Sequence, residues 1–540
     1  MVRNSHDLYS YRTASFMRRT TVTNRARSYP IDVAAIDIGS NAIRYVSASF
    51  VTPTVYTVIE QERLPVRLGH NVFLNGRLDD EAMDKAIAGL EVFRRRIKRL
   101  GIEHLRVIAT SAVRESQNCK VFVDRARKEA GVEIDVITGA EEARLVYEAV
   151  KRTVKLAQKA AFLINVGGGS TELSLINDKE MLWNETRSVG AVRLYEEMCE
   201  DHKEPVRYEK LLEEYVDALK LTSDPELKHV DQFIATGGNI EELARIANHT
   251  EDRDVIVLTT QKLARTIKML SRMSRQERIK RFNLKEDRAD VILPAGMVYL
   301  RFAHLLKKDS LIVPSIGTKE GILFDLVNSV TEHSAHLVSQ EKQLLSFASK
   351  IGRHYMFEKS HALHVQRLAL SLFDQLAAMH GLSQRERNIL IVASLLHDIG
   401  SFVSFKGHHK HSFYLITQTE IPGMSDRDTL IVANTARYHR KAEPSENHHG
   451  FSSLNKDEKI VVEKLASLLR VADALDRDHR QSVKSIITEV SGTTINLKVE
   501  GRGGLRLDRW AMMRKGELFT RVFGRKIKVL TKDNGDDICQ

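Results

Sequence analysis

Phe162–Leu175 reads FLINVGGGSTELSL, in which an apolar run meets an alternating run through three consecutive glycines. Both runs have the length and residue types of β-strands, so the stretch predicts two strands joined by a tight turn. Glycines allow backbone N–H groups to converge on one point, and such a concavity binds anions. Ser170 and Thr171 add hydroxyl donors, and Glu172 adds a carboxylate. A phosphate with a divalent cation is the expected ligand of this turn.

A second turn of this kind lies near the start of the chain, which weakens the alternative of a plain hairpin. Val33–Val46 reads VAAIDIGSNAIRYV: an apolar strand, an acidic residue, a turn with glycine and a hydroxyl, and a second strand. Two such phosphate loops predict an α/β fold with two duplicated domains that hold the ligand between them. This is the arrangement of the actin-like and sugar-kinase-like (ribonuclease H-like) ATPases.

The motifs between and after the two loops are more specific. Thr110–Glu115 (TSAVRE) and Gly139–Leu145 (GAEEARL) occur in order along the chain. Together with the loops they resemble the exopolyphosphatase / guanosine pentaphosphate phosphatase (Ppx/GppA) family, from about residue 31 to residue 326 and on into the C-terminal third. The resemblance implies a hydrolase of phosphoanhydride bonds that depends on magnesium and forms a homodimer.

The two adjacent glutamates of GAEEARL cannot both face the ligand, because neighbouring helical residues point about 100° apart. The resemblance implies that Glu142 is the catalytic residue that activates water and that Glu141 is its structural partner. Arg114 is expected to clamp a phosphate oxygen, with an ion pair to Glu115 or Asp124 as the alternative. The predicted phosphate-binding residues are Gly39, Ser40, Asn41, Arg114, Gly167, Gly168, Gly169, Ser170 and Thr171.

Asp37, Asn165 and Glu172 are the predicted ligands of Mg²⁺. The family usually has aspartate at the position of Asn165. Asparagine keeps a carbonyl oxygen but lacks the charge that hard cations prefer. Weaker metal binding, a different metal or lost catalysis are the three outcomes that this change leaves open.

The first functional hypothesis is an exopolyphosphatase that releases orthophosphate from the ends of inorganic polyphosphate. Conversion of guanosine pentaphosphate to tetraphosphate, a reaction of the stringent response, is the alternative, because both substrates present a terminal phosphoanhydride. A sensor that binds polyphosphate or a nucleotide without hydrolysis is the third hypothesis, motivated by Asn165. A kinase is less favoured, since the sequence indicates no pocket for a second substrate.

From about Thr331 amphipathic helices replace the strand signals. Ser394–Gly400 (SLLHDIG) looks like an HD-type metal-dependent phosphohydrolase module, with His361 and Asp473 as outer ligands. This resemblance implies a possible second divalent metal at His361, His397, Asp398 and Asp473, a ligand set that suits borderline and hard cations. An inactive module that mediates dimerisation or lines an anion path is the alternative. His408, His409, His411 and His439 lie in the same section.

Composition sets the remaining expectations. The net charge of +11 indicates an anionic partner, and no aromatic-rich RNA motif points to a specific nucleic acid. Three unpaired cysteines predict a reducing cytoplasm, and no apolar run approaches a transmembrane segment. The predicted domains are a disordered basic tail (1–30), two actin-like domains (31–150 and 151–330), a helical HD-like domain (331–482) and a small α+β segment (483–540).

Overall fold

The first half of the chain is built around β1 (Ile31–Ile38), whose residues are buried except for Asp32. The computed structural model describes residues 29–70, 72–156, 160–198, 205–221, 229–248, 254–331, 334–440, 442–501 and 506–531. The first sheet has the order β3-β2-β1-β4-β5. Its other strands are β2 (Ile43–Phe50), β3 (Tyr56–Leu64), β4 (His104–Ala109) and β5 (Asp135–Val136). β1 pairs antiparallel with β2 and parallel with β4, so the loop after β1 and the start of the TSAVRE motif meet at one sheet edge.

The second sheet repeats this plan in the order β10-β11-β9-β6-β7-β8. Its strands are β6 (Ala160–Val166), β7 (Thr171–Ile176), β8 (Met181–Arg187), β9 (Val230–Thr236), β10 (Val255–Thr259) and β11 (Ser310–Pro314). β6 and β7 pair antiparallel on either side of the triple glycine, as the sequence predicts. β6 and β9 are parallel, with Asn165 opposite Thr236, so the loops after both strands open at the same edge.

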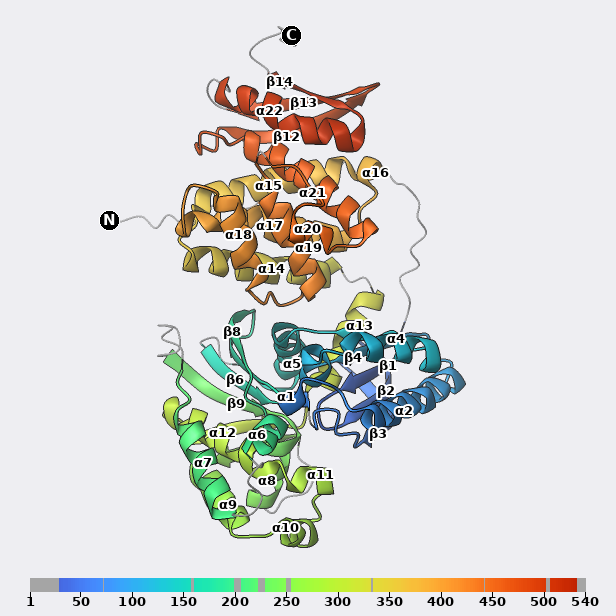
Figure 1. Ribbon diagram of the computed structural model, residues 1–540, viewed down its shortest axis with the longest axis vertical. Coiled ribbons are helices and arrows are strands. Elements are labelled where there is room, and N and C mark those ends of the chain that lie inside the picture. The colour runs from blue at the N-terminus through green and yellow to red at the C-terminus, as the bar shows by residue number, and fades with distance from the viewer. Residues whose placement is uncertain are drawn as a thin grey trace, which may run out of the picture.

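Helices cover the two sheets and connect them (Figure 1). In the first half they are α1 (Val72–Asn75), α2 (Asp80–Arg99), α3 (Ser111–Glu115), α4 (Cys119–Arg125), a π-helical turn (Ala126–Ala130) and α5 (Gly139–Thr153). The second half adds α6 (Ala191–Met198), α7 (Pro205–Asp217), α8 (Gly238–Asn248), α9 (Thr260–Ser271), α10 (Arg275–Phe282), α11 (Glu286–Ala289), α12 (Ile292–Leu305) and α13 (Thr318–Thr331).

α5 and α13 cross between the two sheets and share one apolar core with strands of both. The crossing is close, because a Cβ on Gly321 of α13 would lie 2.1 Å from the carbonyl oxygen of Leu145 on α5. Only glycine allows this approach without a shift of the backbone. α13 also packs on β1, so a helix that ends the second half belongs to the packing of the first.

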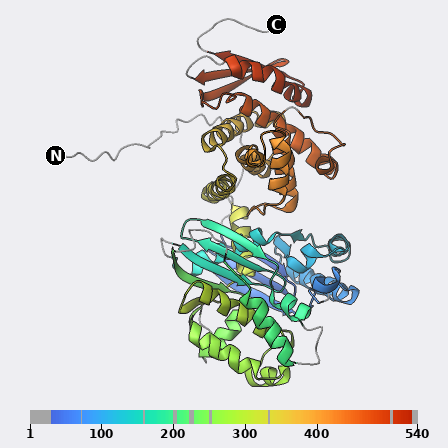
Figure 2. The same cartoon turned by 60° about the vertical axis from the view of Figure 1, so that its left-hand side comes forward.

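The C-terminal part forms two further tiers along the long axis of the molecule (Figures 1 and 2). The helical tier contains α14 (Ser334–His354), α15 (Lys359–Gln375), α16 (Ala377–His380), α17 (Gln384–Leu396), a 3-10 helix (Ile399–Phe402), α18 (His408–Thr417), α19 (Asp426–Arg437), α20 (His449–Ser452) and α21 (Lys456–Ala474). The last tier contains β12 (Val483–Ser491), β13 (Thr494–Gly501), α22 (Arg506–Phe523) and β14 (Lys526–Thr531).

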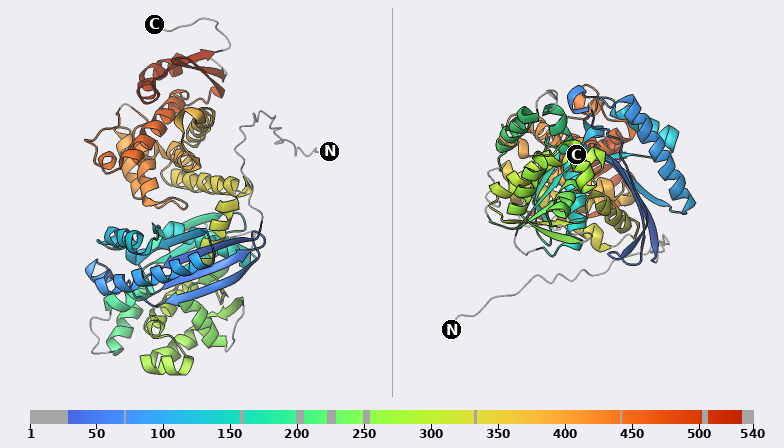
Figure 3. Two further views of the ribbon diagram at one scale, coloured as in Figure 1. Left: turned by 90° about the vertical axis from the view of Figure 1, so that its right-hand side faces the viewer. Right: turned by 90° about the horizontal axis from the view of Figure 1, so that it is seen from below.

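The β-containing segment lies at the far end of the molecule from the second α/β half (Figure 3). Its sheet has the order β12-β13-β14, and its apolar side chains, such as Leu497 and Phe519, join the core of the helical tier. Helices follow Thr331, and the three strands of the last tier follow Ser482. The predicted basic tail up to residue 28 lies outside the described residues, as do Cys199 and Cys539. Among the described helices, none is both long and apolar enough to cross a membrane.

Candidate functional site

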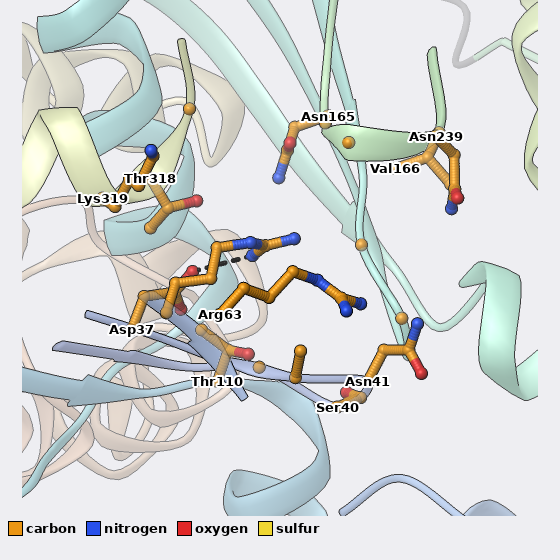
Figure 4. Close-up of a pocket in the computed structure, with 18 of the residues that line it drawn as sticks. Asp37, Ser40, Asn41, Arg63, Thr110, Asn165, Val166, Asn239, Thr318 and Lys319 are labelled. Carbon is orange, nitrogen blue, oxygen red and sulfur yellow. Dashed lines mark hydrogen bonds and ion pairs between the residues drawn. The ribbon is translucent and has the colours of Figure 1, made fainter. Parts of the chain in front are cut away.

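A cavity of about 410 Å³ lies between the two α/β halves, and both glycine-containing loops line it. Gly39, Ser40 and Asn41 come from the loop after β1, and Gly167, Gly168 and Ser170 come from the loop after β6. Figure 4 shows Ser40 at one side of the cavity and Asn165 at the other, with Arg63 extending between them. Residues that are more than a hundred positions apart therefore share one cleft.

The two loops touch each other where Gly168 meets Ser40. A Cβ on Gly168 would lie 2.7 Å from the Cβ of Ser40, and one on Gly190 would lie 2.3 Å from the carbonyl oxygen of Gly168. A side chain at Gly168 would force the two loops apart, and one at Gly190, just before α6, would displace the loop after β6. The hydroxyl of Ser40 lies 3.0 Å from that of Ser111 at the start of α3, which ties the first loop to the end of β4.

Glu142 enters this cavity from the first turn of α5. Thr138 caps the helix by accepting a hydrogen bond from the Glu141 backbone N–H. The side chain of Glu142 is buried, and its Oε2 finds no hydrogen-bond partner among the described residues. Glu141 points elsewhere and accepts a hydrogen bond of 2.7 Å from Nε of Arg144. The two adjacent carboxylates thus have different surroundings, because neighbouring residues of a helix point in different directions.

The surroundings of Glu142 disfavour its ionised form. Burial raises the pKa of Glu142 well above that of an ordinary carboxyl, and the carboxylates of Glu172 and Asp37 raise it further. Arg114 and Arg44 oppose this rise. A buried carboxyl group with a raised pKa and an oxygen that has no hydrogen-bond partner among the described residues has the properties of a proton acceptor for catalysis.

The raised pKa of Glu142 predicts a pH-dependent stability difference between the wild type and Glu142→Gln. Because the folded-state pKa is raised, the group contributes its stabilisation at acidic pH, below the pKa of the unfolded chain, and loses it as pH rises through the folded-state pKa. Glutamine is neutral at every pH. In EDTA, thermal denaturation from pH 5 to pH 8 should show the Tm of Glu142→Gln rising relative to that of the wild type. A constant Tm difference across this range would contradict the raised pKa.

Asn165 is part of a buried hydrogen-bond chain next to the cavity. Its Nδ2 donates to Oε2 of Glu172 at 2.9 Å, and its Oδ1 accepts from the Thr236 hydroxyl at 3.3 Å. Ser170 donates to Oε1 of the same glutamate at 2.5 Å. Both oxygens of Glu172 are therefore occupied. Burial raises the pKa of Glu172, against the two side-chain hydrogen bonds, which favour the carboxylate.

Asp37 is the last but one residue of β1 and lines the cavity, where its Oδ2 accepts from Nη1 of Arg44 at 3.0 Å (dashed in Figure 4). The register places Asp37 opposite Arg44 across the β1–β2 pair. Arg44 belongs to β2, the second strand of the VAAIDIGSNAIRYV stretch, but no sequence motif marks it as a site residue. The guanidinium of Arg44 reaches the edge of the cavity only because β2 pairs with β1.

Several other cations line the cavity, and sequence reasoning did not single them out. Arg63 on β3 donates through Nη1 to Oδ1 of Asp287 at 3.2 Å. Arg288 is held by Glu242 at 2.8 Å, and Lys319 lies 3.2 Å from Oε1 of Gln61. They come from both halves of the chain, so only the folded arrangement gathers them. Gly237, Gly238 and Asn239 also line the cavity, and Gly237 has a φ of +113°, which favours glycine.

Four of the residues predicted to bind phosphate or Mg²⁺ in the cleft do not line this cavity. Arg114 donates to the Ile137 carbonyl at 2.7 Å, and Thr171 donates to that of Val189. The carbonyl of Gly169 accepts from Nε of Arg193 at 2.8 Å. Glu172 lies behind Asn165 and Ser170, with which it forms hydrogen bonds. Arg114 remains close enough to lower the pKa values of Glu142 and Glu172.

The helical tier contacts the helix that carries Glu142. Oε2 of Glu420, in the loop after α18, accepts from the Ala140 backbone N–H at 3.0 Å and from the Thr186 hydroxyl at 2.9 Å. Gly423 donates its N–H to Glu141 at 2.9 Å. Glu420 thus satisfies a free N–H in the first turn of α5 and places a negative charge at its positive end.

The four residues predicted as a second metal site converge in the helical tier. Nε2 of His361 lies 3.5 Å from Oδ1 of Asp473 and 4.0 Å from Oδ2 of Asp398. Nε2 of His397 lies 3.6 Å from the same oxygen of Asp398 and 3.8 Å from that of Asp473. The two histidines and two acids thus surround one point.

Comparisons with known proteins agree with this architecture. The profile of the Ppx/GppA phosphatase family matches residues 49–330, and that of Ppx/GppA phosphatase domain III matches residues 346–504. A guanosine-5'-triphosphate,3'-diphosphate pyrophosphatase of Photobacterium profundum is 26% identical over 459 residues, which cover 83% of this chain and 88% of that protein. A Vibrio vulnificus protein of the same name is 24% identical over 477 residues, or 87% and 92% of the two chains.

The crystal structure of an exopolyphosphatase from Cytophaga hutchinsonii is similar in fold, with a TM-score of 0.50 and 26% sequence identity. The similarity covers 55% of this chain and 98% of that chain. Two consecutive profile matches, the duplicated α/β halves and the two loops that share a cleft all lead to one assignment: the chain belongs to the Ppx/GppA phosphatase family.

Proposed function

We propose that this protein is an exopolyphosphatase that hydrolyses the terminal phosphoanhydride bond of inorganic polyphosphate in the cleft between the α/β halves. The observation that carries the proposal is the buried carboxyl of Glu142, which has an unpaired oxygen and lies in a cavity lined by two glycine-containing loops. Arg44, Arg63, Arg288 and Lys319 line the same cavity and suit a polyanion.

In the proposed reaction Glu142 accepts a proton from a water molecule as the water oxygen bonds to the terminal phosphorus. The bond between that phosphorus and the bridging oxygen breaks, which releases orthophosphate and a chain shorter by one phosphate. Backbone N–H groups of Gly39–Asn41 and Gly167–Ser170 hold the terminal phosphate, and the cavity cations stabilise the charge on its oxygens. Arg114 does not line the cavity and donates to the Ile137 carbonyl just after β5. Its positive charge is proposed to act on the phosphate charge from this distance.

A magnesium ion fits the oxygen donors at this site. Asp37 and Asn165 line the cavity, and Glu172 lies one hydrogen bond behind Asn165. Carboxylate and carboxamide oxygens are ligands that Mg²⁺ accepts, and the ion would neutralise phosphate charge. We propose Asp37, Asn165 and Glu172 as its protein ligands.

Hydrolysis of guanosine pentaphosphate is the second candidate, and the names of the Photobacterium and Vibrio relatives favour it. Orthophosphate release should be measured with long-chain polyphosphate and with guanosine pentaphosphate at equal concentrations of terminal phosphate. The first proposal predicts the higher kcat/KM for polyphosphate. A clear preference for the nucleotide would replace it with the second and connect the enzyme to the stringent response, and binding of both without release would indicate a sensor.

Asn165→Asp tests whether the carboxamide weakens metal binding. The aspartate would lose the hydrogen bond to Glu172 and place two carboxylates about 3 Å apart, so a cation between them becomes more favourable. We expect half-maximal activity at a lower Mg²⁺ concentration and a lower Tm in EDTA than for the wild type. Mg²⁺ titrations of activity and thermal denaturation measure both effects. An unchanged Mg²⁺ requirement would remove position 165 from the proposed ligands.

Three further expectations complete the proposal. The convergence of His361, His397, Asp398 and Asp473 supports an HD-like module that binds a divalent metal. A homodimer follows from the family resemblance alone, and gel filtration with light scattering tests it. A cytoplasmic location is inferred from the cysteine content.

A further inference from the structure

α9 and α10 lie at the end of the second α/β half that faces away from the helical tier (Figure 1), and this end is strongly basic. Residues 260–288, which form α9, α10 and the start of α11, contain ten lysines and arginines but only three acids. The whole chain, in contrast, has 82 basic and 71 acidic residues. This short segment therefore carries more than half of the net charge of +11.

α9 presents a stripe of cations to solvent. Arg265, Lys268 and Arg272 are exposed and follow one another at a spacing of three and four residues, which places them on one side of the helix. The opposite side of α9 packs on α8 and α12 in the apolar core of the second half. Among the described residues, none of the three cations pairs with an acid. The stripe is therefore available to an external anion.

The basic run of α2 has a different environment. Nη2 of Arg95 lies 3.7 Å from Oε1 of Glu91. Nη2 of Arg99 lies 2.8 Å from Oε1 of Glu60, so acids balance part of the charge of this helix. Such mixed charges are typical of a solvated helix surface. α9 contains no acid, and its stripe is not balanced in this way.

α10 continues the basic surface toward the cleft. Two of its arginines hold the helix in place. Nε of Arg275 donates to Asp290 at 2.6 Å, and Arg278 donates to backbone carbonyls at the end of α9 and in α11, at 2.9 and 3.1 Å. No residue of α10 is buried, and Lys280 and Arg281 are exposed in its last turn. These two cations face solvent between α9 and the cavity.

The basic surface reaches the cavity where the two α/β halves meet. Asp290, the partner of Arg275, also accepts from Nη2 of Arg67 in the first half at 2.8 Å. Lys285, which is exposed between α10 and α11, lines the cavity together with Arg288. The twelve residues of α9 and the eight of α10 are about 18 and 12 Å long. Exposed cations thus extend from the cavity along α10 to the middle of α9.

We propose that α9 and α10 bind the inorganic polyphosphate chain beyond the phosphates that occupy the cleft. Polyphosphate is charged at every phosphate, so a surface of unpaired lysines and arginines attracts it along its length and displaces its counterions. This assignment rests on the proposed exopolyphosphatase activity and adds a binding site for the polymer. Single-stranded RNA would match the charge as well. However, Phe282 is the sole aromatic residue of the segment and packs against the core, so the surface offers no ring for base stacking.

Arg265→Ala/Lys268→Ala/Arg272→Ala tests this surface with chains of two lengths. Calorimetric titrations in the Glu142→Gln protein measure binding without turnover, with polyphosphate of several hundred phosphates and with tripolyphosphate, which is too short to reach α9 from the cavity. The triple substitution should raise the Kd of the long chain about tenfold, a factor of about two for each exposed charge. The Kd of tripolyphosphate should stay within about twofold. An equal change for both ligands, or no change for the long chain, would overturn the proposal.

Arg95→Ala/Lys98→Ala/Arg99→Ala is the matched control, because it removes the same charge from exposed positions of α2. It should leave the Kd of the long chain within about twofold. The slope of log Kd against log salt concentration should fall by about two in the α9 variant and stay unchanged in the α2 variant, since about 0.7 counterions are released per neutralised phosphate of a single strand. An equal loss of affinity in both variants would show that only the overall charge acts, which overturns the proposal.

Lys280→Ala/Arg281→Ala gives an independent test at α10 and should raise the Kd of the long chain about fourfold, at a factor of about two for each charge. The Tm of each variant identifies any loss of binding that comes from unfolding. Displacement of polyphosphate by single-stranded RNA of equal charge at an equal or lower concentration would assign the surface to nucleic acid and overturn the proposal. Absence of phosphate release from polyphosphate by the wild type would contradict the proposed function instead, and the binding comparison would still decide whether the surface holds the chain.

Discussion

Glu142→Gln should lower kcat for orthophosphate release from polyphosphate by about 10²–10⁴-fold, the range typical for removal of a general base. Glutamine keeps the shape of the side chain and its place in α5 but cannot accept a proton from water. Because the residue is not proposed to bind the metal or the bulk of the polymer, KM should change little. Initial rates of phosphate release over a range of polyphosphate concentrations separate the two parameters.

Glu133→Gln is the matched control for this experiment. Glu133 is an exposed glutamate of the same half, just before β5, and it lies outside the cavity. Its substitution should leave kcat within about twofold, as is usual for surface changes. The pH profile gives a further check: activity of the wild type should fall as pH decreases through the raised pKa of Glu142, because only the ionised form accepts a proton. Full turnover by Glu142→Gln would show that another group activates the water.

Asp37→Asn should have the second-largest effect. The substitution removes a charged oxygen from the proposed Mg²⁺ site and weakens the partner of Arg44, which lies 3.0 Å away. Changes around a metal site cost about 10–100-fold in affinity or activity, and loss of a charged ligand should reach the upper end of this range. We expect a corresponding fall in kcat/KM at moderate Mg²⁺, with partial recovery at high Mg²⁺.

Asp32→Asn serves as the control because Asp32 is the exposed residue of the same strand, β1. It should leave both activity and the Mg²⁺ requirement unchanged. A Mg²⁺ titration of phosphate release distinguishes metal loss from general damage, since a misfolded variant does not recover at high Mg²⁺. A fall in activity that Mg²⁺ leaves unaffected, with a normal Tm, would mean that Asp37 acts through Arg44 alone.

The two loops could be predicted because their signals are local. Three glycines between two apolar strands specify a turn from the residues themselves, and β6 and β7 form this hairpin in the predicted place. The helix after Thr138 was equally clear, since a capping hydroxyl and acids in the first turn are short-range features. The placement of Glu142 and Glu141 in different surroundings follows from helical geometry alone.

The cations of the cavity could not be predicted, because they depend on how distant elements dock. Arg63 and Arg288 come from β3 and α11, and neither strand nor helix carries a motif that marks them. Arg114 shows the opposite case: its local sequence indicated a phosphate ligand, yet its guanidinium donates to the Ile137 carbonyl. The approach of His408 and His439 to Asp398 could not be predicted either, because the fold alone brings both histidines to one oxygen of that carboxylate.

A crystal structure of Glu142→Gln with Mg²⁺ and a short polyphosphate tests the central claim most directly. The account predicts that the terminal phosphate lies about 3 Å from backbone nitrogens of both loops, Gly39–Asn41 and Gly167–Ser170, within reach of residue 142 through one water molecule. A polyphosphate end bound by one loop alone, or bound away from residue 142, would contradict it.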